Sequence, residues 1–317
     1  MIKIGTLISV IFVCWSVFFS ALAGGLVVKD QSIDLPSLKN PMQYSLYLPD
    51  GYCEENLSYP ILYLLHGYGG SHRDWLNGGS VVKTLDRLIA NGLISPLIVV
   101  MPSASKSWYV NSSKHGQFET ALLLEFPKLL EANLHSLKVR EGRAIAGLSM
   151  GGYGALRFAF RSPEKFGSVA ALSPAIFPNV VGKDAFKPVQ LKLFAGAFDE
   201  PFSSDKYNER NVFTLAKTIS NPPAIYLTVG DDDWFGLYAG TFSFYQHLKS
   251  QKIPVELRVT DGNHNWKLWS REIERVLIFL NEQLSPAIQR SLVFKDMDQD
   301  VAVETIINNN KSTLCFR

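Results

Sequence analysis

The sequence predicts an α/β fold in which a mainly parallel β-sheet is covered by helices on both faces. Short apolar runs alternate with helical patterns from about Leu35 to Leu284. Some of these runs, such as Pro60–Leu65, are apolar without interruption, which is typical of strands buried on both faces. Strands that are separated by helical patterns need crossover connections, and such crossovers place the helices over the sheet.

The first half of the chain contains three expected strands and two expected helices. A first strand is expected at Tyr44–Leu48, because a Pro-Asp-Gly turn follows it. The apolar runs Pro60–Leu65 and Leu97–Met101 predict buried strands. Helical periodicity covers Val81–Leu93, and the amphipathic stretch Glu119–Leu134 predicts a long helix.

The second half continues the alternation. Four further apolar runs predict strands: Arg143–Leu148, Ser168–Leu172, Ala224–Val229 and Val255–Val259. Two helices are expected, at Tyr153–Phe160 and at Leu268–Leu284, and the second of these is amphipathic and closes the pattern.

The alternation of strand and helix patterns is interrupted between Pro174 and Asn208. This stretch is long for a connection and is rich in aromatic residues, namely Phe177, Phe186, Phe194, Phe198, Phe202 and Tyr207. Connections of this length are usually functional. The stretch is therefore either a lid over a site or a decorated surface loop.

The stretch Ala146–Gly152 carries the pattern G-x-S-x-G between an expected strand and an expected helix. In that context Ser149 occupies a sharp strand-to-helix turn that presents its hydroxyl as a nucleophile. Gly147 and Gly151 let the backbone atoms of this turn approach closely. A glycine-rich turn with a solvated serine is the alternative interpretation.

A serine nucleophile needs a base and a group that orients the base. In α/β-hydrolases the acid and then the histidine follow the serine along the chain. Two histidines follow Ser149: His247 lies within a helical pattern, whereas His264 lies in a loop just past the last expected strand. We therefore expect His264 to be the base. Spacing leaves the acid open among Asp231, Asp232 and Asp233, which follow the preceding strand; Asp231 follows it most directly, and Asp233 allows the chain to turn back first.

The negative charge that develops on the substrate oxygen needs two backbone N–H donors. We expect one donor to be the amide of Met150, which follows the nucleophile, and the other to come from the glycine-containing loop that begins at His66. A metal site formed by His66, His72 and Asp74 is a weaker alternative, because no further cluster supports it. We expect neither a metal nor an organic cofactor.

Five tryptophans lie near these loops: Trp75, Trp108, Trp234, Trp266 and Trp269. Ligand sites are mostly apolar and aromatic. We expect Trp108, Trp234 and Trp266 to contact an acyl or aryl substrate. Simple packing of the loop bases is the alternative.

Composition restricts the class of protein. The chain has 317 residues and a net charge of +2, and nothing in its charge pattern indicates binding to nucleic acid or to a membrane surface. Residues 1–23 read as a signal peptide, with an apolar run that ends in the small-x-small sequence Ala21-Leu22-Ala23. An uncleaved anchor is the alternative. We expect an exported protein with no stable membrane insertion after cleavage, and no pattern in the chain indicates its oligomeric state.

The predicted mature chain has one catalytic domain, residues 24–285, and a polar tail, residues 286–317, whose role is open. It keeps two cysteines, Cys53 and Cys315. An exported protein can pair them. Two free thiols are the alternative.

Four segments together resemble a known group of enzymes: Tyr63–Gly67, Ser107–Tyr109, Arg143–Leu156 and Gly262–Trp266. They are similar to the esterase D, feruloyl esterase and antigen 85 group of α/β-hydrolases, and most of all to its small tributyrin-esterase-like members. The resemblance covers about residues 41–284. It implies the α/β-hydrolase fold, with Ser149 as nucleophile and His264 as base.

The resemblance also implies roles that spacing leaves open. The family acid is the aspartate of a Gly-x-x-Asp turn, which corresponds to Asp233, and the first oxyanion amide corresponds to that of Tyr68. The cysteine-rich N-terminal pattern of cytosolic S-formylglutathione hydrolases is missing from the sequence, and the long acyl groove of the mycolyl-transferring members cannot be located in it.

These observations predict an exported serine carboxylesterase that hydrolyses short-chain acyl or aryl esters through an acyl-enzyme. The expected partner is a small ester substrate. Three alternatives remain: an acyltransferase of the antigen 85 type, a thioesterase of the S-formylglutathione hydrolase type, and a non-catalytic binding protein on the same fold.

Overall fold

A computed structural model describes residues 24–53, 55–182, 186–194 and 196–289, and every structural statement below concerns these residues. The predicted signal peptide and residues 290–317 of the predicted tail lie outside them. None of the helices in the described part of the chain is long and apolar enough to cross a bilayer.

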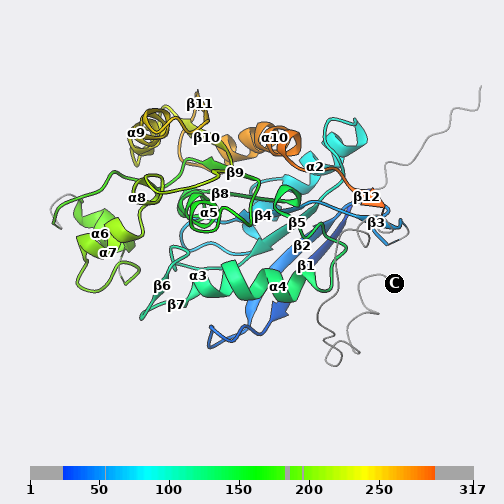
Figure 1. The fold of residues 1–317 in the computed structure, drawn as a ribbon, viewed down its shortest axis with the longest axis horizontal. Helices are drawn as coiled ribbons and strands as arrows, with labels where there is room; N and C mark the ends of the chain where they lie inside the picture. Colours follow the sequence, from blue (N-terminus) through cyan, green and yellow to red (C-terminus); the bar gives the residue numbers. More distant parts are fainter. Residues whose placement is uncertain (1–23, 54, 183–185, 195, 290–317) are drawn as a thin grey trace, which may run out of the picture.

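The fold is built on an eight-stranded sheet (Figure 1). Its strand order is β1-β2-β5-β4-β8-β9-β10-β11. In chain order the strands are β1 Leu26–Ile33, β2 Met42–Leu48, β4 Ile61–Leu65, β5 Ile98–Pro102, β8 Arg143–Leu148, β9 Ser168–Leu172, β10 Ala224–Gly230 and β11 Glu256–Thr260. The pairs formed by β1 with β2 and by β2 with β5 are antiparallel, and the remaining pairs are parallel.

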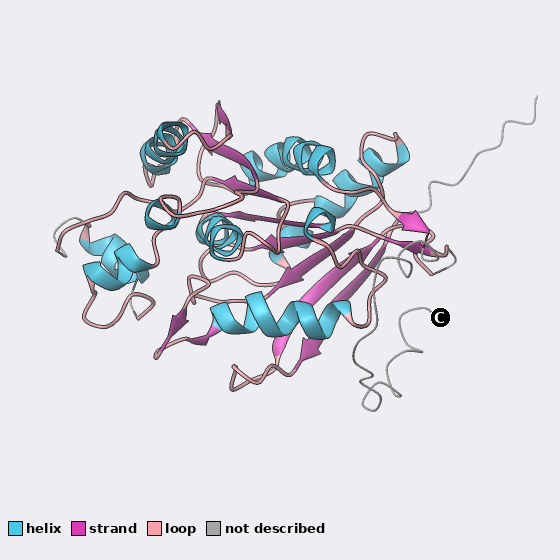
Figure 2. Cartoon of the chain, in the orientation of Figure 1, coloured by secondary structure: helices cyan, strands magenta, loops and turns pink. Residues whose placement is uncertain are grey.

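Helices cover both faces of this sheet (Figure 2), so the predicted α/β class is confirmed. One face carries α2 (Val81–Ala90) and α10 (Trp266–Gln283). The opposite face carries α4 (Phe126–Glu131), α5 (Met150–Arg161) and α9 (Leu237–Ser250).

Strand β4 shows why its apolar run is continuous. Its alternate residues Ile61, Tyr63 and Leu65 pack into the core on the α5 face, whereas Leu62 and Leu64 pack into the core on the α10 face. Side chains of a strand point to opposite faces in turn. A strand between two helical layers must therefore be apolar at every position.

Two elements differ from the sequence-based expectation. A strand, β1, precedes the expected first strand and pairs with it at the edge of the sheet. The expected helix Glu119–Leu134 is a short helix α3 (Phe118–Thr120), a π-helical turn (Ala121–Glu125) and then α4. Proline at the start of α4 has no N–H for an i→i−4 bond, which accounts for the local change of helix type.

Smaller elements extend from the two ends of the sheet. The segment after β9 forms α6 (Pro188–Phe194), α7 (Ser204–Glu209) and α8 (Val212–Leu215), and Figure 1 shows α6 and α7 at one end of the molecule. At the opposite end, β3 (Leu57–Ser58) pairs with β12 (Ile288–Gln289), so the start of the predicted tail packs on the domain. The remaining short elements are α1 (Asp74–Asn77), β6 (Asn111–Ser112), β7 (Gly116–Gln117) and a 3₁₀ turn (Arg140–Gly142).

A buried ion pair joins α4 to the start of β8. Glu131 is 3% exposed, and it accepts hydrogen bonds from Arg143 Nε and Nη2, each at 2.8 Å, and from the Tyr63 hydroxyl at 2.8 Å. Breaking such a pair leaves an uncompensated buried charge.

We expect Arg143→Ala to lower the free energy of unfolding by about 3–5 kcal/mol, because it leaves the Glu131 carboxylate buried without its cation. Urea unfolding followed by circular dichroism measures this loss. Arg87→Ala is the control: its partner is Glu274 and both side chains are more than 40% exposed, so a loss below about 1 kcal/mol is expected. Equal losses in the two variants would contradict the assignment.

Candidate active site

Ser149 lies at the sharp turn between β8 and α5. Its backbone adopts φ 54° and ψ −118°, a conformation that costs a non-glycine residue roughly 1–3 kcal/mol. Strand β9 holds this turn, because the Ser149 amide donates to the Leu172 carbonyl and the Ser149 carbonyl accepts from the Ala175 amide, both at 2.9 Å. The side chain is therefore fixed at the end of the sheet by its neighbours.

The turn lies directly against the loop that follows β4. A Cβ atom on Gly151 would lie 2.5 Å from the His66 carbonyl oxygen, so only glycine fits there. A Cβ atom on Gly67 would lie 3.7 Å from the Cβ of Ser149. The loop predicted to stabilise the oxyanion therefore lies beside Ser149.

Three side chains from separate loops converge here. His264 Nε2 lies 3.0 Å from Ser149 Oγ, and its Nδ1 lies 2.7 Å from Asp233 Oδ2. His264 is 8% exposed and Asp233 is 3% exposed. Because the carboxylate can only accept, Nδ1 carries the proton and Nε2 is free to accept the serine proton. The structure thus brings together the three residues that the sequence and the resemblance named.

The choice among the consecutive aspartates depends on the turn after β10. Asp231 is exposed and accepts a hydrogen bond from the Gly262 amide at 3.1 Å, and the exposed Asp232 donates its amide to the Gly262 carbonyl at 3.0 Å. The chain then turns inward and buries Asp233 against His264. Spacing could not identify this residue because the direction of the turn decides it.

Asn263 links the two loops that carry Asp233 and His264. Its Oδ1 accepts hydrogen bonds from the Trp234 amide at 3.0 Å and from the His264 amide at 2.8 Å. One side-chain oxygen therefore positions both Trp234, the residue after Asp233, and His264. Sequence reasoning missed this role; only the position of Asn263 next to His264 could have suggested it.

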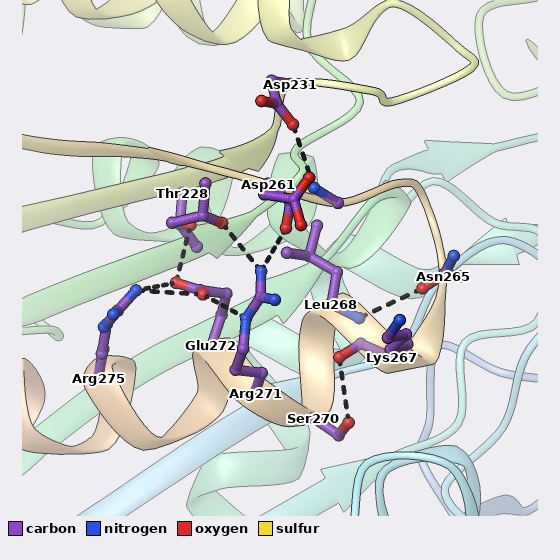
Figure 3. A network of polar contacts seen from close by, with 12 residues as sticks. Thr228, Asp231, Asp261, Asn265, Lys267, Leu268, Ser270, Arg271, Glu272 and Arg275 are labelled. Atoms are coloured by element: carbon purple, nitrogen blue, oxygen red, sulfur yellow. Dashed lines mark hydrogen bonds and ion pairs between the residues drawn. The ribbon is translucent and has the colours of Figure 1, made fainter.

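Helix α10 holds the same loop from the other side (Figure 3). Arg271 Nη2 donates to the Asp261 carbonyl at 2.5 Å, and Arg271 Nε donates to Glu272 Oε1 at 3.3 Å. The buried Glu272 also accepts from Arg275 at 3.3 Å and from Thr228 of β10 at 3.4 Å. This network connects the start of the loop that carries His264 to α10 and to β10.

The tryptophans occupy different places around the site. Trp269 is 7% exposed and packs edge-on against His264, with ring centroids 4.9 Å apart. The half-buried Trp266 packs between Trp269 and Trp75, with centroids 5.3 Å from each. These three rings form a wall behind the imidazole. Trp234, by contrast, is 64% exposed.

Trp108 joins the loop that follows β4 to the aromatic segment after β9, which the sequence left open as a lid or a decorated surface loop. It is 4% exposed, its ring centroid lies 6.3 Å from that of Tyr68, and its Nε1 donates to the Leu193 carbonyl at 2.7 Å. Phe194 and Phe198 also pack against it. The aromatic residues of the segment after β9 therefore form a cluster that is seated on Trp108.

His66 anchors the loop that follows β4. Its Nε2 accepts from the Ala104 amide at 2.8 Å, and its Nδ1 donates to the Gly67 carbonyl at 2.6 Å. Burial lowers the pKa of His66, which favours the neutral ring that this pairing needs. The adjacent Tyr68 amide has no acceptor within the described part of the chain, and the Met150 amide lies at the first residue of α5.

The residues considered as a metal set have other partners. His72 contacts Ser103 and Asp30, at 2.8 Å each. Within the described ranges, one group of carboxylates lies close enough to hold a cation, namely Asp231, Asp232 and Asp261, and all three are exposed. An exposed acidic cluster is not by itself a metal site.

We expect Asn263→Ala to slow the labelling of Ser149 by a fluorophosphonate probe about tenfold or more, because small displacements of a catalytic group are costly. Asn263→Asp keeps the oxygen that both amides use, so labelling within about threefold of wild type is expected. The rate is measured on folded protein whose melting temperature is recorded in parallel. Equal rates for the alanine variant and wild type would exclude a positioning role.

Comparison with known proteins identifies the family of the chain. Residues 36–280 match an esterase family described as "Putative esterase". An acetyl esterase of Caldicellulosiruptor saccharolyticus is 28% identical over 239 residues, covering 72% of this chain and 85% of that protein. An esterase of Mycobacterium tuberculosis is 31% identical over 246 residues, covering 69% of this chain and 52% of that protein.

Solved structures show the same fold. A ferulic acid esterase superposes with a TM-score of 0.71 and 26% identity, and the match covers 83% of this chain and 99% of that one. Mycobacterium tuberculosis MPT51, at 17% identity, has a TM-score of 0.67 over 81% of this chain and 98% of its own. The resemblance inferred from the sequence is thus confirmed. The chain belongs to this esterase family and is a carboxylic ester hydrolase of the serine-hydrolase type.

Proposed function

We propose that the protein hydrolyses short-chain acyl esters through a triad of Ser149, His264 and Asp233. The observation that carries the proposal is the position of the His264 ring, whose two nitrogens lie 3.0 Å from the serine hydroxyl and 2.7 Å from the aspartate carboxylate. Both distances are within the reach needed for proton transfer and for orientation of the base. The strained, fixed backbone of Ser149 keeps the hydroxyl in this geometry.

The chemistry follows from these positions. Ser149 Oγ attacks the ester carbonyl while Nε2 of His264 takes the hydroxyl proton. Asp233 holds the ring in the correct tautomer and stabilises the imidazolium that forms. The amides of Tyr68 and Met150 stabilise the oxyanion. Nε2 then gives its proton to the departing alcohol, and the ring next activates a water that releases the acyl group from Ser149.

The surroundings of the oxyanion loop favour a small acyl group. Trp108 and the aromatic rings of the segment after β9 fill the space beside Tyr68. Trp108, Phe194 and Phe198 are each 4% exposed or less, so these rings are closely packed. We expect acetyl esters to be the preferred substrates, because a relative that aligns with this chain over 85% of its own length is named an acetyl esterase. Aryl esters such as ferulates are the second candidate substrates, because a structural neighbour is named a ferulic acid esterase.

We expect Ser149→Ala to lower kcat for p-nitrophenyl acetate by about a millionfold, since the nucleophile is lost. Asp233→Asn is expected to lower it about ten-thousandfold, because the amide favours the wrong imidazole tautomer. Steady-state hydrolysis at pH 7 measures both.

Asp232→Asn is the matched control. This neighbouring carboxylate is exposed and has no contact with His264 among those found in the described part of the chain, so activity within about threefold of wild type is expected. A Ser149→Ala enzyme as active as wild type would refute the triad. A loss in Asp232→Asn equal to that in Asp233→Asn would refute the choice of acid.

We also propose that the protein is exported and carries a Cys53–Cys315 disulfide. Two observations support this: the apolar leader that ends at Ala23, and a disulfide bond at Cys53. Disulfides persist in oxidising compartments. The sequence has three cysteines, and Cys14 would be removed with the leader, so Cys315 is the partner left for Cys53 in the proposed mature chain. Cys14 and Cys315 both lie outside the described residues.

Peptide mapping of the exported protein without reduction tests this. We expect an N-terminus at Gly24 and one peptide pair that links Cys53 to Cys315 and separates on reduction. A protein that keeps residues 1–23, or whose Cys53 and Cys315 both react with iodoacetamide before reduction, would contradict the proposal.

A further inference from the structure

The segment Ser107–Tyr109 forms a strained turn beside the loop that follows β4. Trp108 and Tyr109 have φ values of 57° and 56°, in the left-handed region that bulky residues rarely adopt. The Ser107 hydroxyl accepts a hydrogen bond from the Tyr109 amide at 3.1 Å and holds the turn. Such a conformation persists only where the surrounding structure imposes it, and it often occurs at a functional site.

The turn places the Tyr109 side chain in the core, with its hydroxyl against the loop that follows β4. Tyr109 is fully buried, and its ring packs on α5, where a Cβ atom on Gly154 would lie 2.5 Å from that ring. The hydroxyl donates to the His66 carbonyl at 3.0 Å. Burial raises the pKa of Tyr109 well above its usual value, so the hydroxyl keeps the proton that it donates.

The His66 side chain holds the next peptide unit. Its Nδ1 donates to the Gly67 carbonyl at 2.6 Å, and the Gly70 amide donates to the same carbonyl at 3.1 Å. This carbonyl and the Tyr68 amide belong to one trans peptide unit, in which the C=O and the N–H point in opposite directions. The hydrogen bond from His66 therefore directs the Tyr68 N–H away from the His66 ring.

Gly67 is the reason that both hydrogen bonds matter. It joins the peptide unit that Tyr109 holds to the peptide unit that carries the Tyr68 N–H, and glycine permits a wider range of φ and ψ than other residues do. A larger residue cannot supply the missing rigidity, because a Cβ atom on Gly67 would lie 2.8 Å from the Leu148 side chain. The hydrogen bonds on either side of Gly67 therefore fix the direction of the Tyr68 N–H.

We propose that Tyr109 is a positioning residue for ester hydrolysis: its hydroxyl fixes the His66–Gly67 peptide unit, so that the Tyr68 N–H points at the oxyanion. The proposal rests on the function proposed above, in which the Tyr68 amide stabilises the oxyanion, and it adds a residue that acts through the backbone. A donor is effective only when it is aimed at the position of the developing charge. Loss of the Tyr109 hydroxyl should therefore slow the chemical step without weakening the binding of the ester.

Tyr109→Phe tests this role, because it removes the hydroxyl and keeps the ring against α5. We expect kcat for p-nitrophenyl acetate to fall about tenfold, less than for the loss of a whole oxyanion donor, while KM stays within about twofold of wild type. The ketone 1,1,1-trifluoro-2-butanone is the second probe, because the Ser149 hydroxyl adds to its carbonyl and the resulting oxygen occupies the oxyanion position. Its inhibition constant should rise about tenfold in the same variant.

Tyr207→Phe is the matched control. Tyr207 is also buried, and its hydroxyl also donates to a backbone carbonyl at 3.0 Å, that of Phe177 in the segment after β9. Both variants lose one buried hydrogen bond, so similar decreases in melting temperature are expected. Tyr207→Phe should nevertheless keep kcat and the inhibition constant within about twofold of wild type, because its hydroxyl bonds a different segment.

Two results for Tyr109→Phe would overturn the assignment: a kcat within about twofold of wild type, or a lower kcat with an unchanged inhibition constant for the ketone. A loss of kcat in Tyr207→Phe equal to that in Tyr109→Phe would overturn it as well, because it would show a general effect of lost stability. A wild-type protein that hydrolyses no ester and is not inhibited by the ketone would instead contradict the proposed function.

Discussion

The parallel pairing of β8, β9, β10 and β11 is the constraint on which the site depends. Parallel strands end at one edge of a sheet, so the loops that leave their carboxyl ends meet there. Ser149 follows β8, Asp233 follows β10 and His264 follows β11. Residues that are 115 apart in the chain thereby come within 3.0 Å of each other.

The loops beyond the strands are held in place by polar contacts. Beyond the end of β10, the Asp231 amide donates to the carbonyl of Thr260, the last residue of β11, and the Asp232 amide donates to the carbonyl of Gly262. Asn263 then links the two loops at the level of the triad, and Arg271 ties the histidine loop to α10. Asp233 and His264, although they lie on loops, are thus connected to the sheet and to α10 through hydrogen bonds.

Aromatic side chains divide the surroundings of the triad into three parts. Trp269, Trp266 and Trp75 fill the space behind His264. Trp108 connects the oxyanion loop to the aromatic cluster of α6 and its neighbours. Trp234 remains exposed in front of the site. The tryptophans near the site therefore have different surroundings. Trp75, Trp108 and Trp269 are buried and pack against neighbouring side chains, whereas Trp234 is exposed to solvent.

The sequence alone determined the α/β class, the strand-to-helix turn at Ser149 and the esterase family, because local patterns carry them. Continuous apolar runs specify doubly buried strands, and the glycines around Ser149 specify a turn that few other residues permit. Tertiary structure alone decided the rest. The resemblance had pointed to Asp233, but the burial of Asp233 and the exposure of Asp231 depend on the loop packed against this turn. The bridging role of Asn263 and the edge strand β1 emerged only from contacts with residues distant in the chain. A local sequence pattern does not specify which distant segments come into contact, because those contacts form only when the chain is folded.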